Sequence, residues 1–135
     1  MDVIKNSINT ILVMSIILLA SCTHNKNDYF IKYSHNNINK NDIQLIKAIF
    51  FESSFNNDFI EIKVNDETIF RDTITTSNMG LAKYIPLNNY MIKKLCISIN
   101  KNNFMIKKGC CKYLFINKSK DTIYINYDDK VYGYR

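Results

Sequence analysis

The chain has 135 residues, of which 47% are hydrophobic, and a formal net charge of +6 at pH 7. This length suffices for one domain with a modest core. With only three glycines, the chain has no Gly-rich loop of the kind that binds nucleotide phosphates. The positive charge could attract anionic lipid head groups, acidic glycans or an acidic protein, but a solvated surface without such a partner is the favoured interpretation. We expect no nucleic-acid binding because no motif for it is present.

The N-terminal segment has the features of an export signal. Ile11–Ala20 is apolar, Lys5 precedes it, and small residues close it. Ten residues span about 15 Å as a helix, roughly half of the hydrocarbon core, which argues against a transmembrane helix. The position favours a signal segment over the alternatives, a buried helix or the apolar part of an ordinary secretory signal.

The residues that end this segment, Leu19-Ala20-Ser21-Cys22, resemble the lipobox of bacterial lipoproteins. The resemblance implies that residues 1–21 are a signal peptide and that Cys22 becomes the acylated first residue. It also implies a lipid-anchored protein of the cell envelope, and we expect the outer membrane. Each buried CH₂ of an acyl chain contributes about 0.8 kcal/mol, so two or three chains anchor firmly. Asp2 departs from the positively charged start of such signals.

Residues 22–42 are polar, rich in Asn and aperiodic, which predicts a flexible tether. Alternatively, the apolar residues among Tyr29–Tyr33 could add an edge strand. Many surface lipoproteins of the Bacteroidetes carry an acidic cluster directly after the cysteine, and residues 23–28 lack it. The resemblance therefore leaves open whether the protein faces the periplasm or the cell surface.

From residue 43 onward the pattern is that of short strands separated by turns. Ile43–Phe51 could be a strand or a short helix, and Pro86 suggests an edge or an end for the strand that contains it. Residues 90–94 could form one helical turn. The expected strands in this half of the chain are Phe59–Val64, Thr68–Ile74 and Leu81–Leu87.

Two hairpins are expected in the last third, each with a four-residue turn. The first joins residues 95–99 to 104–106 and sets Ile99 opposite Phe104. The second joins Lys112–Asn117 to Thr122–Tyr127. It sets Ile116 opposite Ile123 on one face and Phe115 opposite Tyr124 on the other. A last strand is expected at Val131–Arg135.

These expectations amount to about nine short β segments at intervals of roughly ten residues. That spacing predicts an all-β fold, a small antiparallel β-sandwich of immunoglobulin-like architecture over residues 43–135. A small open β-barrel is the alternative.

Catalytic groups are scarce in this sequence. Both histidines, His24 and His35, fall in the expected tether, where no rigid scaffold holds them. We therefore expect no enzyme, no cofactor and no metal site. Export would place the cysteines in an oxidising compartment, where Cys96 could bridge to Cys110 or Cys111. Free thiols and a thiolate metal site are the alternatives, and the usual CxxC spacing is missing.

The best candidate for a binding site is the aromatic face of the second hairpin. The expected register projects Tyr113, Phe115 and Tyr124 together. Flat rings beside Lys and Asn suit sugar stacking or an apolar patch of a protein partner. The alternative is that this face packs in the core.

The sequence thus favours a lipid-anchored envelope lipoprotein that acts as a non-catalytic binding or assembly module, with a protein or glycan partner. The alternative is an inhibitor or immunity-type lipoprotein that blocks one enzyme or toxin. No residue pattern supports that alternative specifically.

Overall fold

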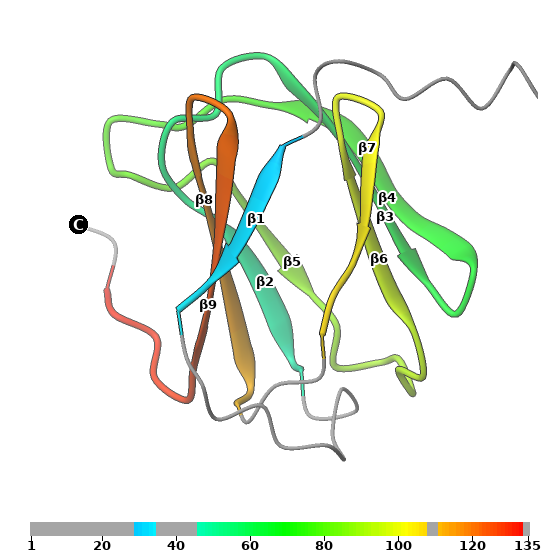
Figure 1. Ribbon diagram of the computed structural model, residues 1–135. Helices are drawn as coiled ribbons and strands as arrows, with labels where there is room; N and C mark the ends of the chain where they lie inside the picture. Colours follow the sequence, from blue (N-terminus) through cyan, green and yellow to red (C-terminus); the bar gives the residue numbers. More distant parts are fainter. Residues whose placement is uncertain (1–28, 35–45, 108–110, 134–135) are drawn as a thin grey trace, which may run out of the picture.

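The computed structural model describes residues 29–34, 46–107 and 111–133, and this part of the chain is all-β. Two sheets pack face to face as a sandwich, and the described strands do not close into a barrel (Figure 1). The all-β sandwich expected from the sequence is therefore confirmed. The described part contains no helix with the length and apolar character needed to cross a bilayer.

The larger sheet has five strands in the order β1-β9-β8-β2-β5, and the smaller has four in the order β4-β3-β6-β7. The strands of the larger sheet are β1 (Phe30–Tyr33), β2 (Ala48–Phe51), β5 (Lys83–Pro86), β8 (Tyr113–Ser119) and β9 (Thr122–Asp128). Those of the smaller sheet are β3 (Asp58–Val64), β4 (Glu67–Ile74), β6 (Leu95–Ile99) and β7 (Asn102–Met105).

The core lies between the sheets and follows from alternation along each strand. In β3 every second residue is buried, and in β6 Leu95, Ile97 and Ile99 face inward while Cys96 and Ser98 are only partly buried. Fully burying one such aliphatic side chain contributes roughly 1.5–3 kcal/mol. The larger sheet meets these residues with the inward side chains Ile49, Phe51, Ile85, Leu114, Ile116, Ile123, Ile125 and Tyr127.

The first strand comes from the segment expected to be a tether. Phe30–Tyr33 pairs in parallel with β9, so the edge-strand alternative is the one observed. The Tyr33 hydroxyl donates to the Met105 carbonyl oxygen at 3.3 Å, and its ring stacks on Tyr127 at 6.2 Å. Burial raises the pKa of Tyr33 and keeps that donor protonated. In this way β1 bridges the open side of the sandwich between β9 and β7 (Figure 1).

The larger sheet is mixed rather than wholly antiparallel. Besides β1 with β9, β2 pairs in parallel with β8, so that Phe50 lies beside Phe115. Parallel neighbours cannot be joined by a tight turn, and the chain reaches each partner by a long crossover. The expected antiparallel arrangement holds for the whole smaller sheet and for the β8–β9 and β2–β5 pairs.

The helical turn expected at residues 90–94 is not formed. Asn65 instead supplies the hydrogen bonds that a helix would provide. Its Oδ1 accepts from the backbone N–H groups of Lys93 at 2.8 Å and Lys94 at 3.0 Å, and its Nδ2 donates to the Met91 carbonyl at 2.8 Å. A side chain that satisfies backbone groups in this way stabilises an irregular loop.

The last strand expected at Val131–Arg135 is also absent over the described residues 131–133. Asp128 ends β9 because its Oδ1 accepts a hydrogen bond from the Lys130 backbone N–H at 3.0 Å. Such a side-chain bond to the backbone two residues on is typical of a turn.

Both expected hairpins form, each with a two-residue turn in place of the expected four-residue turn, which shifts the register by two residues. Asn100 and Lys101 adopt φ of 48° and 70°, and this two-residue turn pairs Ile99 with Asn102. Positive φ at both central residues matches the type I′ turn, whose twist suits a hairpin. A shift of two residues keeps each side chain on its expected face, so Phe104 still lies on the face of Ile97 and Ile99.

In the second hairpin Ser119 pairs with Thr122, and Lys120 in the turn has a φ of 52°. Ile116 therefore lies opposite Ile125, and Phe115 lies opposite Asn126 instead of Tyr124. The observed register therefore places Phe115 and Tyr124, two of the three rings of the expected aromatic face, at different positions along the strands.

An ion pair between the half-buried Lys118 and the buried Asp58 connects the two sheets at one end of the sandwich. Lys118 Nζ of β8 donates to Asp58 Oδ1 of β3 at 2.6 Å, and Asn100 Nδ2 donates to the same oxygen at 2.6 Å. Asp58 Oδ2 accepts from the Asn56 backbone N–H at 2.9 Å. Burial alone would raise the pKa of Asp58, but these bonds outweigh it and lower the pKa. Burial disfavours the charged form of Lys118, but the hydrogen bond and the attraction from Asp58 outweigh this effect, so the pKa of Lys118 is raised.

Replacing Asp58 with Asn is expected to destabilise the fold by about 1–3 kcal/mol near neutral pH, because it leaves the half-buried Lys118 charge without a counter-charge. The wild type is more stable than Asp58→Asn only while Asp58 is ionised, which its lowered pKa limits to pH values above that pKa. The gap between the wild type and Asp58→Asn should therefore shrink as the pH falls from about 6 to about 2 in urea unfolding experiments.

The double variant Asp58→Asn/Lys118→Met serves as the control, because it removes both charges. It should recover much of the lost stability. A gap that stays constant across this pH range would show that the ion pair does not act as described.

Candidate functional site

The outer face of the larger sheet carries a second apolar cluster, separate from the core. Ala48, Phe50 and Phe115 are buried there, with Leu81 and Tyr113 packed against them. Strand β2 is thus buried on both faces, whereas a sandwich strand ordinarily exposes one. The cluster is buried even though it lies on the solvent side of the sheet.

Three aromatic rings of this cluster and the neighbouring ring of Tyr84 come from three adjacent strands. Phe50 of β2 stacks on Phe115 of β8, with ring centroids 4.9 Å apart and planes 15° from parallel. Tyr84 of β5 lies 5.0 Å from Phe50 on the other side, and Tyr113 meets Phe50 edge-on at 6.0 Å. Stacked and edge-to-face pairs each add about 0.5–1.5 kcal/mol beyond area burial, so the rings hold one another in place.

The expected site residues divide between two places. Tyr113 and Phe115 join the cluster, and Phe115 is buried with 7% exposure. Tyr124 lies on the same face but opposite Asn117, where Lys32 Nζ sits 5.9 Å from its ring centroid. Tyr124 is 37% exposed and takes no part in the ring contacts described above.

Phe50 and Tyr84 were not expected to belong to this site. Phe50 sits in the segment 43–51, whose partial alternation left helix and strand open. The rings meet only because β2 lies between β5 and β8. No local pattern specifies the parallel pairing of β2 with β8, because about sixty residues separate their sequences. The one available signal was the apolar run Ala48–Phe51, typical of a strand buried on both faces.

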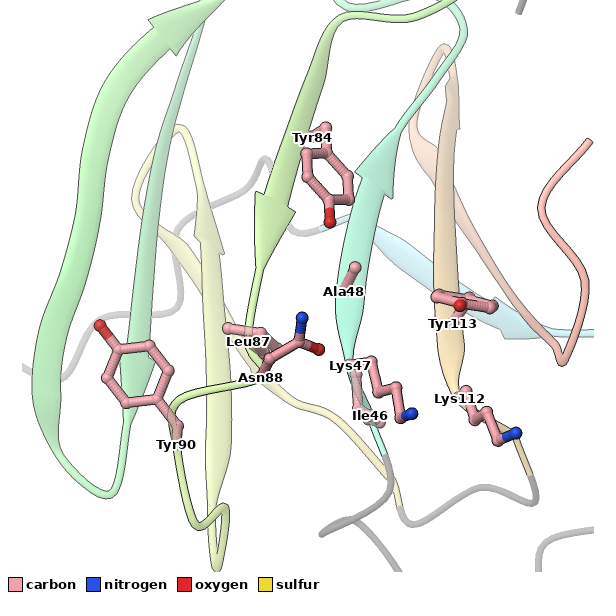
Figure 2. Close-up of a pocket in the computed structure, with 9 residues that line it drawn as sticks. All are labelled: Ile46, Lys47, Ala48, Tyr84, Leu87, Asn88, Tyr90, Lys112 and Tyr113. Atoms are coloured by element: carbon pink, nitrogen blue, oxygen red, sulfur yellow. The ribbon is translucent and has the colours of Figure 1, made fainter. Parts of the chain in front are cut away.

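A groove with a volume of about 490 Å³ opens at one end of this cluster. Figure 2 shows Tyr84 and Tyr113 on either side of Ala48, whose small side chain leaves the floor of the groove low. Asn88 and Lys47 lie toward the lower end (Figure 2). The other residues that line the groove are Ile46, Leu87, Tyr90 and Lys112.

The electrostatic character of the groove is set by Lys47 and Lys112. The Lys47 backbone N–H donates to the Lys112 carbonyl oxygen at 2.6 Å, which holds the two residues side by side before β2 and β8. Their side chains extend in the same direction in Figure 2, and both residues are exposed. Within the described part of the chain, neither ammonium group is within 4.0 Å of a carboxylate oxygen, and no Asp or Glu lines the groove.

A second hollow of about 390 Å³ borders Phe115 and has the opposite character. Glu52 and Asp128 line it together with Asn126 and Tyr132. Glu52 Oε2 accepts a hydrogen bond from Asn117 Nδ2 at 2.8 Å. The outer face of the larger sheet therefore presents a basic groove and an acidic hollow that both adjoin the aromatic cluster.

The cysteines do not form the expected bridge. Cys96 on β6 is a free, half-buried thiol, whereas Cys111 is disulfide-bonded. The sequence-based pairing of Cys96 with Cys110 or Cys111 is therefore wrong. Inter-strand geometry gives a reason, because Cys96 lies beside Met105 and Lys63 in the smaller sheet while Cys111 precedes β8 in the larger.

Several expected features lie outside the described residues: the lipobox with Cys22, both histidines, and Cys110. Among the residues that the structure describes, no group of three His, Cys, Asp or Glu side chains is placed to hold a metal ion. Comparisons with protein-family models, curated proteins and solved structures found no significant match to this chain. The geometry of the groove is therefore the main guide to function.

The two kinds of ring in the cluster should respond differently to truncation. Phe50→Ala is expected to cost about 3–5 kcal/mol of unfolding free energy, because the ring is 6% exposed and its removal leaves a cavity. Tyr84 is 45% exposed, so Tyr84→Ala should cost only about 1 kcal/mol, the worth of its ring contact.

Urea unfolding of both variants measures these costs. Equal costs would show that Tyr84 is a structural residue rather than an available wall of the groove.

Proposed function

We propose that this protein is a lipid-anchored, non-catalytic binding module of the cell envelope. In this proposal Cys22 holds the chain on the membrane, and the outer face of the larger sheet binds a partner in the groove between Tyr84 and Tyr113. The lipobox resemblance of residues 19–22 supports the anchor. The groove supports the binding role.

The observation that carries the binding role is the combination of ring walls and polar groups in one concave site. Ligand pockets are typically lined by aromatic side chains with a few placed polar groups. Here Tyr84 and Tyr113 provide the walls, and Asn88, Lys47 and Lys112 provide the polar groups. The groove also lies within the usual volume range of such pockets, which begins at about 300 Å³.

A binding role without catalysis suits the side chains that line the groove. General acid–base chemistry commonly uses His, Asp or Glu held close to the reacting atoms. The lining residues offer tyrosine, lysine and asparagine, and the lysines are exposed rather than desolvated. Exposed lysines serve better as partners for an anion than as bases.

The test loads the full, cell-purified chain onto liposomes and measures the capture of solubilised envelope components by surface plasmon resonance. The double variant Tyr84→Ala/Tyr113→Ala is expected to lose at least about tenfold in captured mass, because central aromatic residues carry most interface energy. The Cys22→Ala chain should wash off the liposomes, because it lacks the acyl chains.

The matched control is Phe59→Ala/Met105→Ala, which removes two exposed apolar side chains from the other sheet. This control should capture as the wild type does. Capture that survives loss of both tyrosines would contradict the binding role. Retention of Cys22→Ala on the liposomes would contradict the anchor.

A further inference from the structure

We propose that the groove binds an acidic glycan, a chain of pyranose rings that carries carboxylate groups. This inference rests on the proposed function, since it names the class of ligand for the same groove. Three properties of the groove point to this class: the spacing of its walls, the pairing of its lysines, and the amide of Asn88.

The first property is the spacing of the two tyrosine walls. Tyr84 lies on β5 and Tyr113 on β8, and the single strand β2 separates them. Tyr84 pairs with Phe50 and Tyr113 pairs with Ala48, so the walls stand two strands apart and are offset by two residues along β2. This offset puts them about 12 Å apart, which leaves room for one sugar ring above Ala48. One face of a pyranose ring presents C–H groups, and such a face packs well on a flat aromatic ring.

The walls are also held in position before any ligand arrives. Phe50 contacts both of them, with centroids 5.0 Å from Tyr84 and 6.0 Å from Tyr113. Phe50 is itself fixed by its stacking on Phe115. Rigid walls reduce the conformational entropy lost on binding, which matters for a ligand that gains little from each contact.

The second property is the pair of lysines at the end of the groove. A backbone hydrogen bond holds Lys47 beside Lys112, and like charges at neighbouring positions repel each other. The nearby carboxylate of Asp129 accepts its hydrogen bond from the Lys112 backbone N–H at 3.0 Å and is not paired with the ammonium group. A ligand carboxylate between the two ammonium groups would relieve the repulsion through charge-assisted hydrogen bonds.

The third property is the amide of Asn88, which lines the groove on the Tyr84 side, across Ala48 from Tyr113 (Figure 2). An amide both donates and accepts, so it matches neighbouring hydroxyl groups of a sugar. An apolar anchor of a protein partner would instead remove water from Asn88 and both lysines. It offers no hydrogen bonds in place of those lost to water, which is unfavourable. The groove therefore favours an acidic sugar over an apolar protein anchor.

The experiment measures binding of the full chain in detergent to carboxylated oligosaccharides and to the methyl ester of each, beginning with tetragalacturonate, by isothermal titration calorimetry. Esterification removes the charge and leaves the sugar rings unchanged. The acid is expected to bind at least about tenfold more tightly than its ester, and added salt should weaken the binding of the acid only.

Two pairs of variants locate the effect. Lys47→Ala/Lys112→Ala should lower affinity for the acid at least about tenfold and bring it to the level of the ester. The control Lys93→Ala/Lys101→Ala removes the same charge from the loop before β6 and from the β6–β7 turn, and it should bind as the wild type does. Equal unfolding free energies of the two pairs would confirm that both remain folded.

The outcomes separate this inference from the proposed function. If no acid binds more tightly than its ester, the inference is wrong, whereas capture of envelope components that still depends on Tyr84 and Tyr113 keeps the binding role. If an ester binds as tightly as its acid and the lysine pair has no effect, the ligand is a neutral glycan and the charge argument fails. If the tyrosine pair affects neither assay, both proposals fail.

Discussion

The packing of one apolar face of each sheet against the other is the interaction on which the rest of this structure depends. Alternation along β3 and β6 commits half of each strand to that interface and leaves the other half to solvent. Strand β2 is the exception, because Phe50 is buried on its outer face as well. The sheet that contains β2 therefore needs a second set of packed rings outside the core. The walls of the groove belong to that set, so the fold itself supplies a rigid binding surface.

The two ends of β8 use lysine in opposite ways. Lys118 at one end is half-buried and paired with Asp58 across the sandwich, where it contributes to joining the sheets. Lys112, just before the other end, is exposed, and no ion pair within the described part of the chain engages it or its neighbour Lys47. The paired Lys118 serves stability, whereas Lys47 and Lys112, which have no ion-pair partner among the described residues, leave charge available to a ligand. The same strand thus connects the fold to the proposed site.

The sequence predicted those parts of the fold that depend on local alternation, and missed those that depend on distant pairing. The strand at Phe59–Val64 and the apolar face of residues 95–99 follow from period-two patterns. Register was missed by two residues because Asn100-Lys101 forms a tight turn with positive φ without glycine. In the candidate site Tyr113 was expected, whereas its opposite wall Tyr84 was not, because it approaches only through the parallel pairing of β2 with β8.

The measurement that tests the account most directly is hydroxyl-radical footprinting of the full chain, once in isolated envelopes and once purified in detergent. The account expects oxidation of Tyr84 and Tyr113 to fall in the envelopes, because a partner covers the groove there. Phe59 and Met105, exposed on the other sheet, should react equally in both samples. Unchanged oxidation of both tyrosines, or protection of Phe59 and Met105 instead, would contradict the claim that this groove is the binding site.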